Sequence, residues 1–95
     1  MPKSATPEEI NIIFEYIRKL MPDLELRIDR ISVDDILYEG IFISTKIDRE
    51  TSLILTGLVY LKANSLGLVD PNGSMNINMV ATRINNNKNI VLYFT

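Results

Sequence analysis

Residues 6–28, TPEEINIIFEYIRKLMPDLELRI, contain the change of hydrophobic period that decides the fold. Thr6 is followed by a proline and then by Glu9, the capping-box arrangement that begins many helices. Apolar residues then recur every three or four positions as far as Leu20, which predicts one buried stripe on an amphipathic helix. Pro22 ends that helix, and beyond it apolar residues alternate with charged ones, as in a half-buried strand. This stretch therefore predicts a helix that packs on a sheet.

The rest of the chain is predicted to form strands, because apolar residues in it alternate or run continuously between polar turns. The predicted strands are residues 24–33, 36–47, 53–61, 75–82 and 90–94. In the first of them the alternation changes phase near Arg30, which predicts a β-bulge or a break in the strand. Residues 48–51 are predicted as a hairpin loop, and residues 70–73 and 85–87 as turns.

The predicted fold class is α+β, with residues 1–95 in a single domain. One N-terminal amphipathic helix packs on a mostly antiparallel sheet of about five strands, since the connections are too short for crossover helices. Residues 53–61 and 90–94 are apolar on both faces, and one helix cannot cover both faces of such a sheet. Either the sheet closes into a small β-barrel capped by the helix, or another protein, most simply a second copy, covers the second face.

The composition excludes several classes of function. The chain has 95 residues, with 10 Lys and Arg against 12 Asp and Glu, and it has no His and no Cys. The commonest general base near neutral pH and the strongest nucleophile are therefore missing, so we expect neither an enzyme nor a bound cofactor. A net charge of -2 argues against nucleic-acid binding. No stretch resembles a secretory signal or is long enough to span a membrane, and the absence of cysteine fits a reducing compartment, so we expect a cytoplasmic protein.

Two alternatives remain open at this stage. The first is a carboxylate-dependent protein or enzyme that binds a divalent metal through Asp34, Asp35, Asp48 or Glu50, because hard cations prefer oxygen ligands. These residues lack the spacing of an EF-hand, so a metal site is not the first expectation.

The second alternative is an RNA-binding small barrel. A helix followed by five strands is the element order of Sm-like RNA-binding barrels, and the segment from Gly40 to Asp48 loosely resembles their first motif. The spacing departs from that motif, and no Arg-Gly second motif follows. Tyr38, Phe42 and Tyr60 are the aromatic residues that could stack on bases.

The preferred expectation is a small non-catalytic module that binds a protein through a face or an edge of the sheet, as a homodimer. Its partner would be larger, and an accessory, inhibitor, immunity or adaptor role suits a chain of this size. Asparagine amides on a strand face provide adaptable hydrogen bonds, and an apolar strand at a sheet edge can pair with another chain. The candidate binding residues are Tyr60, Asn76, Asn78, Tyr93 and Phe94.

Overall fold

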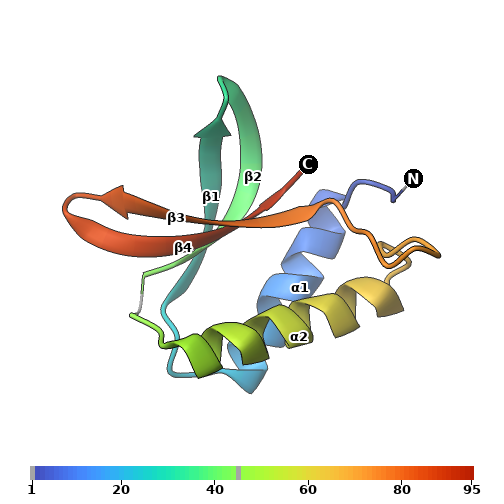
Figure 1. Ribbon diagram of the computed structural model, residues 1–95, viewed down its shortest axis with the longest axis horizontal. Helices are drawn as coiled ribbons and strands as arrows, with labels where there is room; N and C mark the ends of the chain where they lie inside the picture. The colour runs from blue at the N-terminus through green and yellow to red at the C-terminus, as the bar shows by residue number, and fades with distance from the viewer. Residues whose placement is uncertain (1, 45) are drawn as a thin grey trace.

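Two helices pack on one side of an open, four-stranded antiparallel sheet in the computed structural model, which describes residues 2–44 and 46–95 (Figure 1). The strands lie in the order β1-β2-β4-β3. The elements are, in chain order, α1 (Pro7–Leu20), β1 (Leu26–Val33), β2 (Ile36–Ile43), α2 (Arg49–Ser65), β3 (Ile77–Ile84) and β4 (Asn87–Phe94). The predicted α+β class and the antiparallel sheet are confirmed. The closed barrel is wrong, and so is the count of about five strands.

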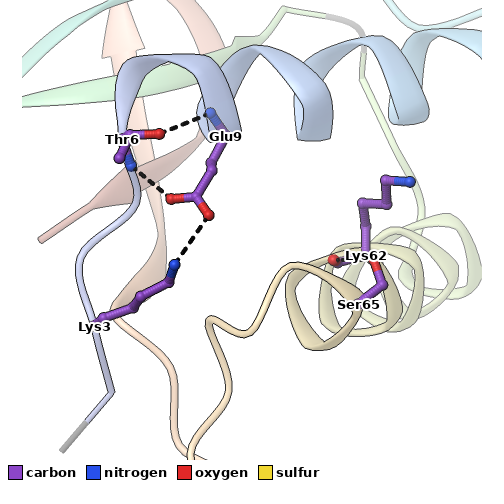
Figure 2. A network of polar contacts seen from close by, with 5 residues as sticks. All are labelled: Lys3, Thr6, Glu9, Lys62 and Ser65. Carbon is purple, nitrogen blue, oxygen red and sulfur yellow. Dashed lines mark hydrogen bonds and ion pairs between the residues drawn. The ribbon is translucent and has the colours of Figure 1, made fainter.

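The N-terminus of α1 is fixed by the capping box that the sequence predicts. The Thr6 side-chain oxygen accepts a hydrogen bond from the Glu9 amide at 3.2 Å, and the Glu9 carboxylate accepts one from the Thr6 amide at 3.0 Å (Figure 2). Lys3 Nζ lies 3.3 Å from the same carboxylate. Two amides that have no partner within the helix are thereby satisfied, and a negative charge lies at the positive end of the helix dipole.

The capping box makes stability depend on pH through Glu9. The hydrogen bond from the Thr6 amide, with help from Lys3, holds the pKa of the Glu9 carboxyl below its usual value of 4.5. The unfolded chain therefore takes up this proton at a higher pH than the folded chain, so the stabilisation is complete above about 4.5 and is lost as pH falls through the lower folded pKa. We expect Glu9→Gln to lower the thermal midpoint at pH 7, with the difference from wild type shrinking below pH 4.5.

The control for this prediction is Glu8→Gln. Glu8 lies in the same helical turn, so it shares the favourable dipole position but not the hydrogen bond to the cap. Thermal midpoints of the three proteins between pH 3 and 7 test the idea. If the wild-type and Glu9→Gln curves stay parallel across that range, the cap carboxylate is not the source of the pH dependence.

The second helix corrects the sequence-based prediction of a strand over residues 53–61. Asp48, placed by the sequence in a hairpin loop, is the N-cap of α2, and its carboxylate accepts a hydrogen bond from the Thr51 amide at 2.7 Å. Leu55, Val59 and Ala63, at spacings of four, form the buried face of the helix. The strand prediction failed because the outer face of α2 is also apolar, which hides the helical period.

Two hairpins with two-residue turns form the sheet. Asp34 and Asp35 connect β1 to β2 with φ of 52° and 65°, and Asn85 and Asn86 connect β3 to β4 with φ of 51° and 66°. Positive φ at both positions is the type I′ turn, whose twist suits a hairpin and which Asp and Asn tolerate. The pairing of β1 with β2 is continuous from end to end, so the predicted bulge or break near Arg30 is wrong.

The other predicted boundaries are partly right. The strand predicted to reach residue 47 ends at Ile43, and the one predicted to begin at residue 75 begins at Ile77. The turn at residues 70–73 is confirmed. There the Gly73 amide donates to the Asp70 carbonyl at 2.9 Å, and the Asp70 carboxylate accepts from the Asn72 and Ser74 amides.

An approximate two-fold relationship, not evident from the sequence, joins the two halves of the chain. Each half is a capped helix followed by a hairpin of eight-residue strands. The two hairpins have the same strand and turn lengths, and each position of the second lies 51 residues after its counterpart in the first. Ile77, for example, begins β3 as Leu26 begins β1. The pairing of β2 with β4 is centred on Ile41 and Leu92, which are also 51 positions apart. The halves therefore meet at equivalent strands.

The core lies between the sheet and the helices. Strand residues that point toward the helices, including Ile41, Ile43 and Leu92, pack with the buried stripes of α1 and α2. Because side chains alternate along a strand, the residues between them point to the other side of the sheet, which we call the open face. Among residues 2–44 and 46–95, no helix is long and apolar enough to cross a membrane.

Candidate functional site

The five residues that the sequence suggested for binding do not form one surface. Asn78 of β3 and Tyr93 of β4 are cross-strand neighbours on the open face. Phe94 points the other way and is buried in the core at 6% exposure. The Asn76 amide donates to the Pro2 carbonyl at 3.0 Å, which ties the N-terminal segment to the chain before β3. Tyr60 lies on α2 and is part of a different layer.

The open face is lined by aromatic side chains, although neither α1 nor α2 covers it (Figure 1). Tyr38 and Tyr93 have ring centroids 5.5 Å apart, and the Arg27 guanidinium carbon lies 4.5 Å from the centre of the Phe42 ring. Phe42 is only 4% exposed. The two hairpins cross steeply in Figure 1, and this strong twist lets side chains of the open face bury one another. Much of its apolar surface is therefore already covered by the chain itself.

The strand that the sequence placed at a possible edge lies in the centre. β4 is paired with β2 on one side and with β3 on the other, so it cannot add a strand from another molecule. The two edges of the sheet are β1 and β3. These edges differ in how far they are protected against pairing.

The β1 edge is protected by charged side chains. Its pairing with β2 continues to a hydrogen bond from the Ser44 amide to the Glu25 carbonyl. Because hydrogen-bonded pairs alternate along an antiparallel ladder, the odd-numbered residues of β1 bond to β2. The even-numbered residues of β1 direct their amides outward. The outward amide of Arg30 donates to the carboxylate of Asp29 at 2.8 Å. That hydrogen bond, followed by those from Arg27, lowers the pKa of the Asp29 carboxyl, so the carboxylate stays charged at neutral pH. A strand approaching β1 would meet an occupied amide and a row of charges.

The β3 edge has no comparable protection. The Thr95 amide donates to the Asn76 carbonyl in continuation of the β3–β4 register, so even-numbered residues of β3 bond to β4. Ile77, Met79, Ala81 and Arg83 therefore direct their amides and carbonyls away from the sheet. Arg83 is the one charged residue in this strand. Met79 is 40% exposed and Ala81 is exposed, so the middle of the edge is accessible.

An apolar groove runs along this edge, between β3 and α2. Its volume is about 140 Å³, and its lining is mostly aliphatic and thioether. The residues that line it are Thr56, Val59, Met75, Ile77, Asn78, Met79 and Leu92. Met side chains adapt to irregular apolar partners, so a strand added to β3 would find a pocket for its helix-facing side chains.

The carboxylates considered for a metal site lie in separate parts of the fold. Asp34 and Asp35 form the tip of the first hairpin, whereas Asp48 caps α2 and Glu50 lies in its first turn. The hydrogen bond from the Thr51 amide lowers the pKa of the Asp48 carboxyl. Capping α2 is therefore sufficient to explain an acidic residue at this position. In the described part of the chain, no group of three or more acidic side chains lies close enough to hold a metal ion.

No protein-family model, curated protein or solved structure matches this chain. The surfaces of the protein are therefore what indicate its function. The element order does not match that of Sm-like barrels. The sheet is open, and α2 occupies the residues that were predicted to form the third strand.

Sequence reasoning missed both the β3 edge and the outer face of α2. The edge could not be found without the strand order, because either end of the chain could have supplied it. The contrast between a charged strand at residues 26–33 and a nearly uncharged one at residues 77–84 is visible in the sequence. Charge is typical of edges that avoid pairing, so this contrast was the available signal.

Proposed function

We propose that the protein is a non-catalytic binding module that captures an extended segment of a partner protein along the edge of β3. The observation that supports this best is the difference between the two edges of one sheet. The β1 edge has an amide already bonded and carries alternating charges, whereas the β3 edge has accessible amides beside an apolar groove. In strand addition, main-chain hydrogen bonds supply affinity and pockets for alternate side chains supply specificity.

The proposal also includes the setting in which the module acts. It is a cytoplasmic accessory protein that associates with itself as a homodimer and binds a larger protein by occluding or bridging it. The absence of cysteine supports the reducing compartment, and the exposed apolar residues support self-association.

A selected peptide tests the edge directly. A random peptide library would be selected against the wild-type protein, and the affinity of a selected peptide measured by fluorescence anisotropy. Ala81→Pro removes an outward amide without breaking a hydrogen bond to β4, so we expect it to weaken binding at least about 10-fold. Ser32→Pro is the matched control, because it removes an outward amide from the β1 edge and should leave the affinity unchanged.

A second control separates the edge from the open face. Tyr38→Lys places a charge on the open face beside Tyr93, and we expect it to leave peptide affinity within about two-fold, because Tyr38 lies on β2, away from the β3 edge and its groove. Amide hydrogen exchange with the peptide bound should slow at Met79, Ala81 and Arg83. Loss of binding in Tyr38→Lys but not in Ala81→Pro would assign binding to the face. If no peptide is selected, or if Ala81→Pro binds normally, the edge proposal is wrong.

A further inference from the structure

The outer surface of α2 is apolar, although it points away from the core. Leu53 is 65% exposed, Ile54 57% and Leu61 60%, and Tyr60 lies beside them at 39%. Gly57 lies at the centre of this group, and a Cβ built on it would meet nothing within 4 Å. We call these five residues the α2 stripe.

The approximate two-fold relationship supplies an internal comparison. α1 is the equivalent helix of the other half, and its exposed positions carry polar residues such as Asn11, Glu15 and Arg18, with an ion pair between the last two at 2.6 Å. A helix whose outer face meets water is thus present in the same molecule and has the usual composition. The α2 stripe departs from that composition, which indicates that another surface covers it.

The order of residues along the stripe shows what kind of surface fits. Counting from Gly57, apolar residues lie three and four positions away in both directions, and polar residues lie seven positions away in both directions. At a rotation of 100° per residue these positions fall on one face of the helix. The pattern therefore reads almost the same from either end, so apolar residues meet apolar residues when the surface pairs antiparallel with its own copy across a two-fold axis.

We propose that the α2 stripe is a self-association surface, on which α2 of a second copy packs antiparallel with the two helices crossing at Gly57. Leu53 and Ile54 of one helix then face the partner's Tyr60 and Leu61. This inference depends on the homodimer included in the proposed function and assigns it to a particular surface.

The polar ends of the stripe select the antiparallel direction. In that arrangement Glu50 of each helix faces the partner's Asn64, whose amide can donate a hydrogen bond to the carboxylate. In a parallel arrangement the two copies of Glu50 would face each other as like charges. Gly57, which costs helix stability at a mid-helix position, lets the two backbones approach closely at the crossing point.

The size of the stripe sets the expected strength. A 17-residue helix is about 26 Å long, and one pair of helix faces buries less than the roughly 1,200 Å² of a standard stable interface. We therefore expect a reversible dimer with a dissociation constant of roughly 10–100 μM. Sedimentation velocity from about 10 to 500 μM spans that range and should show the mass rising from 10.8 kDa toward twice that value.

Two variants with the same change in charge test the surface. We expect Leu61→Glu to weaken dimerisation at least 10-fold, because it places a charge in the apolar contact. Asn11→Glu makes the same change of charge on the exposed side of α1 and should leave the dissociation constant unchanged. Leu53→Glu is a second disrupting variant, and circular dichroism confirms that each protein is folded.

Cysteine crosslinking tests the direction, and the absence of native cysteine makes the reaction clean. Leu53→Cys and Leu61→Cys proteins, mixed under oxidising conditions, should form a disulfide between the two variants. Either variant alone should not crosslink efficiently, because like positions lie about 12 Å apart along the antiparallel pair. Efficient crosslinking of Leu53→Cys with itself would mean a parallel pair and would overturn the inference.

The remaining outcomes separate this inference from the proposed function. A dimer that resists Leu61→Glu would use another surface, which overturns the inference and leaves the homodimer standing. A monomer at every concentration overturns both the inference and the homodimer. Peptide binding at β3 is measured on dilute protein, so its result stands independently of either.

Discussion

Leu55→Ala is expected to lower the free energy of unfolding by about 2–5 kcal/mol, the usual cost of removing a large buried aliphatic side chain. Leu55 is fully buried and belongs to the core between the helices and the sheet. The surrounding strands and α1 cannot close the space completely, so the loss includes a cavity as well as the apolar contacts. Urea unfolding monitored by circular dichroism gives the change from the shift in midpoint.

Leu53→Ala is the matched control, in the same helix and with the same change of side chain. Leu53 is 65% exposed, so the change should cost less than about 0.5–1 kcal/mol in dilute, monomeric protein. In a strand, residues 53 and 55 would point to the same face, and the two substitutions would cost similar amounts. Equal effects would contradict the helix, and a large difference agrees with it.

Gly40→Val is expected to destabilise the fold by about 1–3 kcal/mol or more, because it overfills the place where the two hairpins meet. Gly40 is buried in β2 opposite Tyr93. A Cβ at this position would lie 3.0 Å from Val91 Cγ1 and 3.3 Å from the Leu92 carbonyl oxygen. The backbone oxygen cannot move without disturbing the ladder between β2 and β4, and valine adds two methyl groups to the crowding.

Gly57→Ala is the opposite control. Open space surrounds that position, so replacing a mid-helix glycine with alanine should stabilise dilute protein by up to about 1 kcal/mol. Thermal and urea unfolding should show a lower free energy of unfolding for Gly40→Val and a higher one for Gly57→Ala. If Gly40→Val is neutral, the hairpins do not cross as closely as the structure shows.

The first half of the fold could be predicted from the sequence because its local signals agree with its tertiary packing. The cap at Thr6 and the spacing of Ile10, Ile13 and Ile17 give one answer, a helix with one buried face. The alternation that begins after Pro22 likewise matches the observed strand. The phase change near Arg30 misled the prediction. It arises because Ile28 points to the helix side of the sheet and Ile31 to the open face, which is itself apolar in this hairpin.

The second helix could not be predicted from periodicity, because its outer face is apolar as well as its inner one. Asp48 as an N-cap and the spacing of Leu55, Val59 and Ala63 were the signals available. Thr56 and Gly57 weighed against them, since β-branched residues and glycine have low helix propensity. The same apolar pattern predicted that residues 53–61 are covered on two sides. These residues lie in a helix, and its second apolar side is the exposed α2 stripe.

The candidate site was harder to predict because it depends on strand order. The sequence suggested Asn78 and Tyr93 as binding residues. The structure places them opposite each other on β3 and β4. Nothing in the sequence indicated that Phe94 turns into the core while Tyr93 does not, because residues 90–94 are apolar on both sides. The register of β4 against β2, which places Leu92 opposite the buried Ile41, fixes which face of β4 meets the helices.

The near-equivalence of the two halves has a consequence for how the molecule can be doubled. Because β2 and β4 meet around Ile41 and Leu92, the first half of one chain could pair with the second half of another and keep the same ladder. A domain-swapped dimer of this kind, if formed from unfolded chains at high protein concentration, would exchange slowly, because its halves separate only by unfolding. Its α2 stripes would still be exposed. A dimer of this kind would survive dilution, unlike one held together by the α2 stripes alone.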